Sequence, residues 1–293
     1  MIVDPFLIIA VKSFQQALRF LPEKIQRSIG AAFGRGAYLA LRERRRVAVS
    51  NLLEALPSLG KAGATAVARK CLENLGINFV ESMVLPFIPP NDLTRRFTIE
   101  NRHYADDALA AGKGLVALVF HYANWEIMGV ASRLLHHEIV VLARPLKRHR
   151  RINEFLNSMR AETGLTIIPN ANSARDVMRY LKEGRIVAIL GDQREKRSKA
   201  VYVDFFGRKA PTSRGIAMIG MKTGAPVVPF YFRREGFLRY TIVCCPPLLM
   251  ERKGNIEELV ARNMRRVNEC LESIVRERPE EWFWVHRRWA RKG

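Results

Sequence analysis

His121 and Glu126 are the residues of this sequence whose types and spacing best fit acid–base chemistry. They form the pattern H-x4-E directly after the apolar run 114–120. If that run is a strand and a helix follows, Glu126 lies in the first helical turn, where the helix dipole favours a carboxylate. The carboxylate is then placed to accept a hydrogen bond from one imidazole nitrogen, and the other nitrogen is free to take a proton from a hydroxyl. The pattern predicts general-base catalysis by His121; the alternative is a structural histidine beside a carboxylate.

Motifs of several other enzyme classes are absent from the sequence. There is no G-x-S-x-G motif, which argues against an α/β-hydrolase. No G-x4-G-K-[ST] or G-x-G-x-x-G motif indicates a nucleotide site, and no H-E-x-x-H motif or His/Cys cluster indicates a metal site. The four cysteines contain no C-x-x-C pair, so we interpret them as reduced core residues.

From about residue 100, short apolar runs alternate with helical stretches. The apolar runs have the length of strands and lie at 114–120, 139–143, 165–169, 185–190, 226–232 and 240–245. The helical candidates lie near 124–136, 150–162, 172–183, 213–223 and 255–277. Fully apolar strands separated by helices indicate a sheet that is covered on both faces. We therefore predict an α/β fold with a mixed sheet flanked by helices.

Residues that follow the apolar runs are candidates for a site, because open α/β sheets bind ligands beyond the carboxyl ends of their strands. Asp192, Gln193 and Arg194 follow the fourth run, and Arg144 follows the second. The arginines are candidates for phosphate binding, and Asp192 and Gln193 for orienting the acceptor or the catalytic pair. The alternatives are solvated surface charge for the arginines and loop capping for the other two.

The first 95 residues are predicted to be helical. Helices are expected near 5–21, 23–41 and 61–85, with a basic cluster at 42–46 between them. The first helix is amphipathic, and two interpretations stay open: packing on the core, or lying in a membrane interface with basic residues at lipid headgroups. Lys12 and Arg19 interrupt its apolar run, so we expect neither a cleavable signal peptide nor a membrane span of about 20 residues. We predict a helical membrane-docking region at 1–95 and an α/β core at 96–293.

The chain of 293 residues carries a formal charge of +21. Self-repulsion of such an excess opposes compactness, which points to an anionic partner: nucleic acid, an anionic membrane surface or an acidic protein. The basic run KRHRR at 147–151 favours a nucleic-acid-binding protein. No nucleic-acid-binding motif accompanies it, and most basic runs stand beside apolar or aromatic ones, so we expect no nucleic acid partner.

Six sequence blocks carry a resemblance to a known family. They are HYANWE at 121–126, ARP at 143–145, GDQR at 191–194, VDFFGRKAPTSRG at 203–215, TGAPVVPFYFRR at 223–234 and PEEWFWVHRRW at 279–289. The first resembles the His-x4-Asp/Glu signature of the lysophospholipid acyltransferase superfamily. The others resemble the bacterial lipid A late acyltransferases, the lauroyl and myristoyl transferases of lipopolysaccharide synthesis, in matching order over most of the chain.

The resemblance implies that His121 is the general base and Glu126 its partner. It implies direct acyl transfer from acyl carrier protein to a hydroxyl of a lipid A precursor, without an acyl-enzyme, a metal or another cofactor. It places the enzyme on the cytoplasmic face of the cell inner membrane. The interrupted apolar segment departs from the family and favours peripheral or shallow attachment to an anionic membrane surface. The residues expected to bind substrate are Asn124, Arg144, Asp192, Gln193, Arg194, Phe206, Gly207, Thr212 and Arg233.

Several alternatives stay open within this interpretation. The pair Phe205 and Phe206 either lines an acyl channel or packs in the core. The tryptophans 282, 284 and 289 either sit at a membrane interface or pack over the core. Coenzyme A is the alternative donor, and a lysophospholipid or another glycolipid is the alternative acceptor. A catalytically inactive membrane scaffold is the alternative outside the enzymes.

Overall fold

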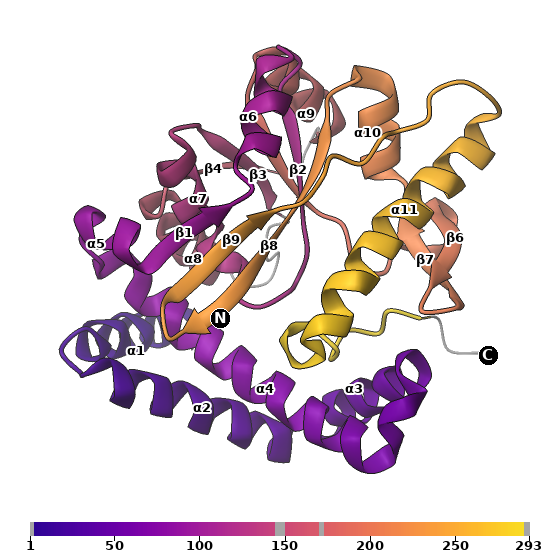
Figure 1. The fold of residues 1–293 in the computed structure, drawn as a ribbon. Coiled ribbons are helices and arrows are strands. Elements are labelled where there is room, and N and C mark those ends of the chain that lie inside the picture. Colours follow the sequence, from indigo (N-terminus) through magenta and orange to yellow (C-terminus); the bar gives the residue numbers. More distant parts are fainter. Residues whose placement is uncertain (1–2, 144–149, 170–172, 290–293) are drawn as a thin grey trace.

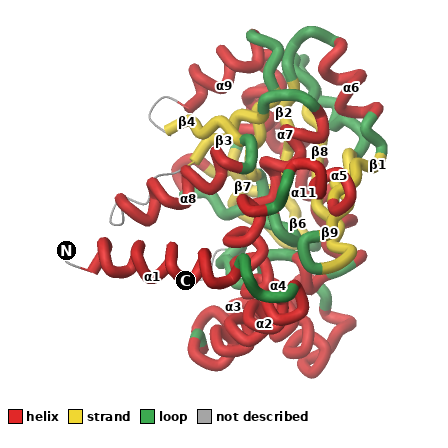
Figure 2. The backbone as a smooth tube through the Cα atoms, turned by 90° about the vertical axis from the view of Figure 1, so that its left-hand side faces the viewer, coloured by secondary structure: helices red, strands yellow, loops and turns green. Residues whose placement is uncertain are grey.

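The computed structural model describes residues 3–143, 150–169 and 173–289 of the chain (Figure 1). Among the described residues, five α-helices precede the first strand: α1 (Val3–Leu18), α2 (Glu23–Ala40), α3 (Arg42–Ala55), α4 (Gly60–Val84) and α5 (Pro90–Arg96). Helices α2, α3 and α4 lie together below the sheet, and α1 projects sideways beneath α8 (Figure 2). Within these residues, no helix is both long enough and apolar enough to cross a membrane.

Three glycines allow α2 and α4 to cross in close contact. A Cβ atom built on Gly34 would overlap the backbone of Leu72, and one built on Gly76 would overlap the backbone of Gly30. Because only glycine lacks this atom, these positions determine how closely α2 packs on α4.

The basic cluster 42–46 forms the first turns of α3, where the sequence analysis expected a segment between helices. Arginine is a good helix former, so its charge does not prevent a helix here. The later part of α3 supplies the apolar face that the cluster itself lacks: Ala48 and Leu52 are fully buried. Most of the arginines of the cluster face outward and are exposed.

In the part of the chain that the structure describes, seven strands form one mixed sheet in the order β1-β9-β8-β2-β5-β3-β4. Their bounds are β1 (Phe97–Glu100), β2 (Leu115–Val119), β3 (Ile139–Ala143), β4 (Leu165–Pro169), β5 (Ile186–Leu190), β8 (Val227–Gly236) and β9 (Arg239–Cys244). Strands β8, β2, β5, β3 and β4 run parallel, β9 is antiparallel to β8, and β1 is parallel to β9. The predicted α/β fold with a mixed sheet is confirmed, and all six predicted strands belong to it. Strand β1 was not predicted, because four residues give no clear periodic signal.

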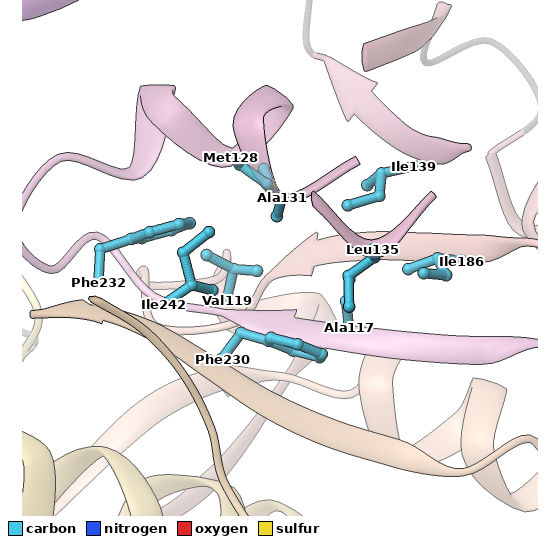
Figure 3. Close-up of a pocket in the computed structure, with 10 residues that line it drawn as sticks. All are labelled: Ala117, Val119, Met128, Ala131, Leu135, Ile139, Ile186, Phe230, Phe232 and Ile242. Carbon is cyan, nitrogen blue, oxygen red and sulfur yellow. The ribbon is translucent and has the colours of Figure 1, made fainter. Parts of the chain in front are cut away.

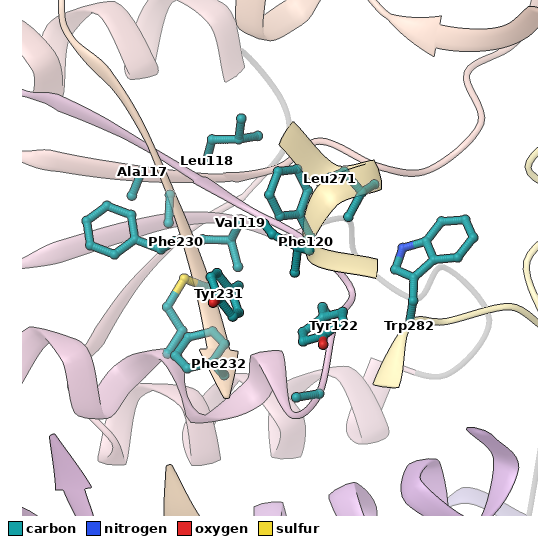
Figure 4. Close-up of a cluster of buried hydrophobic side chains, with 14 of the residues drawn as sticks. Ala117, Leu118, Val119, Phe120, Tyr122, Phe230, Tyr231, Phe232, Leu271 and Trp282 are labelled. Atoms are coloured by element: carbon teal, nitrogen blue, oxygen red, sulfur yellow. The ribbon is translucent and has the colours of Figure 1, made fainter. Parts of the chain in front are cut away.

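Helices cover both faces of the sheet. They are α6 (His103–Ala110), α7 (Met128–Leu135), α8 (Arg150–Glu162), α9 (Ser173–Lys182), α10 (Gly215–Thr223) and α11 (Ile256–Glu277). Helix α7 packs on the face that carries Ala117 and Val119 (Figure 3). Helix α11 packs through Leu271 near Phe120, on the opposite face (Figure 4). The core therefore reaches the residue directly before His121, which makes the end of β2 a rigid support.

A small cavity of about 10 Å³ lies between α7 and the sheet (Figure 3). Its lining residues are all apolar, among them Met128, Leu135 and Phe230. Since a single water molecule needs roughly this much space, the cavity is a packing defect of the core and holds no substrate.

Residues 200–213 form a separate β-hairpin that the sequence analysis did not predict. It consists of β6 (Ala200–Phe205) and β7 (Arg208–Ser213). Phe206 and Gly207 are the two turn residues, with φ angles of 51° and 70°. Left-handed backbone at both positions fits the twist of a two-residue hairpin turn. Phe205 is fully buried with its ring centroid 5.4 Å from that of Trp282, so its role is core packing.

Candidate active site

His121 is held by Asp192. The Nδ1 atom of His121 lies 2.6 Å from Oδ1 of Asp192, and the backbone N–H of His121 donates to Oδ2 over 2.9 Å. The two residues lie 71 positions apart in sequence. They meet because β2 and β5 are adjacent parallel strands, so their carboxyl ends share one edge of the sheet.

Asp192 is ionised and accepts a third hydrogen bond. Trp282 donates its indole N–H to Oδ2 over 2.9 Å. Burial is the largest influence on the pKa of Asp192 and raises it, but the charge of His121 and the hydrogen bonds from His121 and Trp282 together lower it below its usual value. An ionised carboxylate at Nδ1 requires the proton on that nitrogen, which leaves Nε2 as the basic nitrogen of the neutral ring.

The Nε2 atom of His121 lies on the accessible side of the ring. It is 3.1 Å from Nε2 of Gln193, whose amide is the donor when His121 is neutral. The rings of Trp125 and Phe283 pack on the imidazole, with centroid distances of 4.9 and 5.9 Å. The His121 side chain is 13% exposed, so a hydroxyl that displaces the Gln193 amide can reach Nε2.

The structure assigns a different partner to Glu126 than the sequence analysis expected. Arg160 of α8 donates to both carboxylate oxygens of Glu126, from Nε over 2.8 Å and from a terminal nitrogen over 2.7 Å. Among the described residues, no hydrogen bond joins Glu126 to His121. The expected fold-back does not occur, because Ala123 has a left-handed φ of 49° and a 3-10 turn, Trp125–Ile127, precedes α7. The H-x4-E motif therefore does not form one pair. His121 pairs with Asp192, and Glu126 pairs with Arg160.

The Glu126–Arg160 pair lines an apolar cavity beside His121. The cavity has a volume of about 290 Å³ and is formed by α4, the loop after β2 and α8. Its lining residues are Leu75, Asn78, Phe79, Ser82, Met83, Leu85, Asn124, Trp125, Glu126, Leu156, Met159, Arg160, Thr163 and Phe283. Trp125 and Phe283 belong both to this lining and to the rings that pack on His121. Apolar walls with a few polar groups at one place suit a fatty acyl chain whose reactive end lies at the imidazole.

A buried polar network supports the loop that carries His121. Glu81 of α4 is fully buried and accepts hydrogen bonds from Arg234 over 2.7 Å, Tyr240 over 2.5 Å and Asn124 over 3.0 Å. Asn78 donates to the backbone oxygen of Ala123 over 2.6 Å. These hydrogen bonds join α4 to β8, to β9 and to the loop after β2, so the network rigidifies the loop. Glu81 and Asn78 were not predicted as site residues, although polar residues inside the predicted helix 61–85 are a signal of a buried network.

The C-terminal segment closes the site from the other side. Phe283 donates its backbone N–H to the oxygen of His121 over 3.0 Å, and Ala123 donates to the oxygen of Glu281 over 2.8 Å. Trp282, Trp284 and Trp289 are buried, so they pack over the core (Figure 4 shows Trp282). The membrane-interface alternative for these tryptophans is wrong. Trp282 was not predicted as a site residue, because its contact with Asp192 joins segments 90 residues apart.

Three more of the predicted site residues are each joined to another segment of the chain. Arg194 follows Gln193 and donates its backbone N–H to Nε2 of His286 over 2.8 Å. Thr212 is buried and accepts a hydrogen bond from Arg288 over 2.7 Å. Arg233 is paired with Glu100 and Glu235 over 2.7 and 2.9 Å.

Two further predictions concern Phe206 with Gly207, and Arg144. Phe206 and Gly207 form the hairpin turn, and neither lines the cavity that contains Glu126. Arg144 lies outside the described residues, as do most of the residues of the KRHRR run. Within the part of the chain that is described, no group of three or more His, Cys, Asp or Glu residues is arranged to hold a metal ion.

Residues 2–291 match the protein family described as bacterial lipid A biosynthesis acyltransferase. The chain belongs to this family and is an acyltransferase. A phosphatidylinositol mannoside acyltransferase of Mycobacterium tuberculosis strain H37Rv is 29% identical over 240 residues, covering 78% of this chain and 74% of that protein. The lipid A biosynthesis lauroyltransferase of Escherichia coli strain K12 is 21% identical over 270 residues, covering 92% and 86%. The lipid A biosynthesis palmitoleoyltransferase of the same strain is 22% identical with the same coverage.

Proposed function

We propose that this enzyme transfers a fatty acyl group from acyl carrier protein to a hydroxyl of a lipid A precursor, with His121 as the general base. The observation that carries the proposal is the His121–Asp192 contact, which leaves Nε2 as the basic nitrogen beside an apolar cavity. Family membership supports acyl transfer to a lipid. The carrier protein as donor and the lipid A precursor as acceptor follow from the sequence resemblance.

In this mechanism the acceptor hydroxyl gives its proton to Nε2 of His121 while its oxygen attacks the thioester carbonyl. Asp192 stabilises the imidazolium that forms, because the ionised carboxylate lies 2.6 Å from Nδ1. The tetrahedral intermediate then collapses: the new C–O ester bond remains and the C–S bond breaks. The leaving thiolate takes the proton back from Nε2, so the enzyme returns to its starting state.

We propose that Glu126 acts through Arg160. Two hydrogen bonds fix the guanidinium at the wall of the apolar cavity. A fixed cation there is placed to bind a polar group of the substrate near the thioester, and the paired carboxylate keeps it oriented. Asn124 belongs to the same wall, and its side-chain oxygen accepts the backbone N–H of Glu126 over 3.3 Å.

We propose that residues 1–95 dock the enzyme peripherally on the cytoplasmic face of the inner membrane. Helices α1 and α2 and the residues beside them expose large apolar side chains, with Phe20 76%, Leu39 69% and Ile9 61% exposed. Cationic residues of the same region, among them Lys12 of α1 and Arg19 of the turn after it, suit anionic headgroups. The apolar cavity is lined by α4 of this bundle, so an acyl chain at the membrane lies close to His121.

A second acceptor class has support from the comparisons. Two relatives from Mycobacterium tuberculosis are named phosphatidylinositol mannoside acyltransferases, at 28% and 29% identity. A glycolipid built on a phosphatidylinositol, or a lysophospholipid, is therefore the alternative acceptor. The chemistry at His121 is the same in each case.

An acyl-transfer assay tests the proposal. The purified protein in detergent is mixed with acyl carrier proteins bearing radiolabelled chains and with a tetra-acylated lipid A precursor; the phosphatidylinositol mannoside and a lysophospholipid run in parallel. We expect labelled lipid A product with the wild-type protein. The rate of its formation should be about 10²- to 10⁴-fold lower in His121→Ala. Product with another acceptor alone would contradict the lipid A assignment. Turnover near wild type in folded His121→Ala would remove His121 from the mechanism.

A further inference from the structure

A polar groove of about 480 Å³ begins at Arg194, the residue after Gln193. It shares no lining residue with the apolar cavity. We call it the basic groove and define it by its lining residues, which are Glu43, Arg44, Arg194, Glu195, Lys196, His286 and Arg287.

Three segments that are distant in sequence build the basic groove: the start of α3, the loop after β5 and the C-terminal segment. Side chains of α3 hold the C-terminal segment in place. Asn51 donates to the backbone oxygens of Trp284 and His286, each over 2.8 Å, and Arg44 donates to that of Val285 over 3.3 Å. The groove is therefore a fixed feature of the fold.

The loop after β5 is fixed as well. The backbone N–H of Arg194 donates to Nε2 of His286, and Glu195 donates its N–H to the oxygen of Pro211 over 3.1 Å. Burial lowers the pKa of His286 to about 4. The ring is then neutral at neutral pH, which is the state that accepts the hydrogen bond from Arg194.

The charges of the basic groove are unbalanced. Four cationic side chains face two carboxylates, and Arg287 is paired with Glu43. Within the part of the chain that is described, Arg44, Arg194 and Lys196 form no ion pair with a carboxylate. Many other arginines of this protein, for example Arg233 and Arg266, are paired with glutamates. A group of cations without carboxylate partners at a groove suits an anion.

We propose that the basic groove binds a phosphate group of one of the two substrates while the acyl chain occupies the apolar cavity. The proposal rests on the proposed function for the identity of the substrates. Arginine and lysine form charge-assisted hydrogen bonds to phosphate, and polar walls disfavour an acyl chain. Gln193 touches Nε2 of His121 and is followed by Arg194, so a phosphate in the groove anchors a substrate whose reacting group lies at His121.

The variant Lys196→Glu tests the proposal, because the Lys196 side chain, unlike that of Arg44, is not used to hold the C-terminal segment. Lys253→Glu is the matched control: it makes the same change of charge at an exposed lysine outside the groove. We expect the groove variant to raise one KM by between about three- and tenfold, since exposed ion pairs contribute modestly. Its kcat should stay within about twofold of the wild type, because the reacting groups are untouched.

The affected KM identifies the source of the phosphate. A higher KM for the lipid acceptor assigns the groove to a headgroup phosphate, and a higher KM for the carrier assigns it to the phosphopantetheine arm. Both KM values equal to those of the control variant would overturn the proposal.

If no acceptor is acylated, the proposed function is wrong. A binding measurement then tests separately whether the basic groove binds phosphate. Inorganic pyrophosphate is titrated into the full-length protein by calorimetry at low salt. Binding that is lost in the groove variant and kept in the control supports the proposal. Absent binding, or equal binding in both variants, overturns it.

Discussion

The indole N–H of Trp282 donates to Oδ2 of Asp192 over 2.9 Å, and Oδ1 of the same carboxylate lies 2.6 Å from Nδ1 of His121. One carboxylate therefore connects the C-terminal segment with the imidazole at the carboxyl end of β2. A hydrogen bond to an ionised group favours the ionised form, so Trp282 helps to keep Asp192 charged.

Trp282→Phe should raise the pKa of Asp192. The phenyl ring is still aromatic and apolar, but it has no N–H to donate to the carboxylate. Protonated Asp192 cannot stabilise the imidazolium, so the acid side of the pH profile of kcat should move to higher pH. Trp284→Phe is the matched control, since Trp284 is equally buried and donates its indole N–H to the backbone oxygen of Pro279 instead. Identical pH profiles for the two variants would show that Trp282 only packs.

Asp192→Asn should lower kcat by about 10²- to 10⁴-fold with little change in KM. The asparagine keeps the size of the side chain but carries no charge to stabilise the imidazolium. Single-turnover rates with a saturating donor measure the effect. A kcat within about threefold of wild type, in protein with an unchanged thermal transition, would argue against an Asp192-assisted base.

Glu126 and Arg160 should behave as one unit in a double-mutant cycle. Glu126→Gln and Arg160→Met are each expected to lower kcat/KM, and the double variant should be little worse than either single one. The coupling energy expected for a charge-assisted, half-buried pair is about 1–3 kcal/mol. If a cycle with His121 gave the coupling energy and the cycle with Arg160 gave none, Glu126 would be the direct partner of His121, as the H-x4-E spacing first suggested.

His286 should make the folded state sensitive to acid. Its pKa in the folded protein, about 4, lies below the value of ~6.5 for an unfolded histidine. Between these values the unfolded chain binds more protons, so stability rises with pH through this window and is lost as the pH falls. His286→Gln keeps an acceptor for the Arg194 N–H and removes the titration.

Urea unfolding at several pH values measures this effect. The wild-type free energy of unfolding should fall by roughly 1–3 kcal/mol more than that of His286→Gln between pH 6.5 and pH 4. Parallel curves would mean that His286 takes up a proton in the folded state.

Phe20→Ser combined with Leu39→Ser should weaken binding to vesicles that contain anionic lipid. Each side chain is largely exposed, and burial of one in the interface contributes about 1.5–3 kcal/mol. Leu249→Ser is the control, because Leu249 is 81% exposed in the segment between β9 and α11, outside the N-terminal helices. Flotation in a sucrose gradient measures the bound fraction. An equal loss in the control would point to general surface hydrophobicity.

The sequence by itself determined every strand described in the sheet except β1, and the place of His121. Fully apolar runs such as 115–119 have few ways to be buried except as inner strands, and polar residues that follow them must gather at one edge. The same local rules placed Asp192 and Gln193 at that edge. They missed the β6–β7 hairpin, whose strands carry mixed polar and apolar residues and depend on the tryptophans packed against Phe205.

Only the tertiary structure decided which partners meet at the site. Spacing along the chain paired His121 with Glu126, but side-chain direction depends on the left-handed Ala123 and on which helix lies opposite. The strand order brings Asp192 to His121, and the packing of α8 brings Arg160 to Glu126. Trp282 reaches Asp192 only because the chain returns to the sheet after α11. These contacts join residues 34 to 90 positions apart, and no local propensity encodes them.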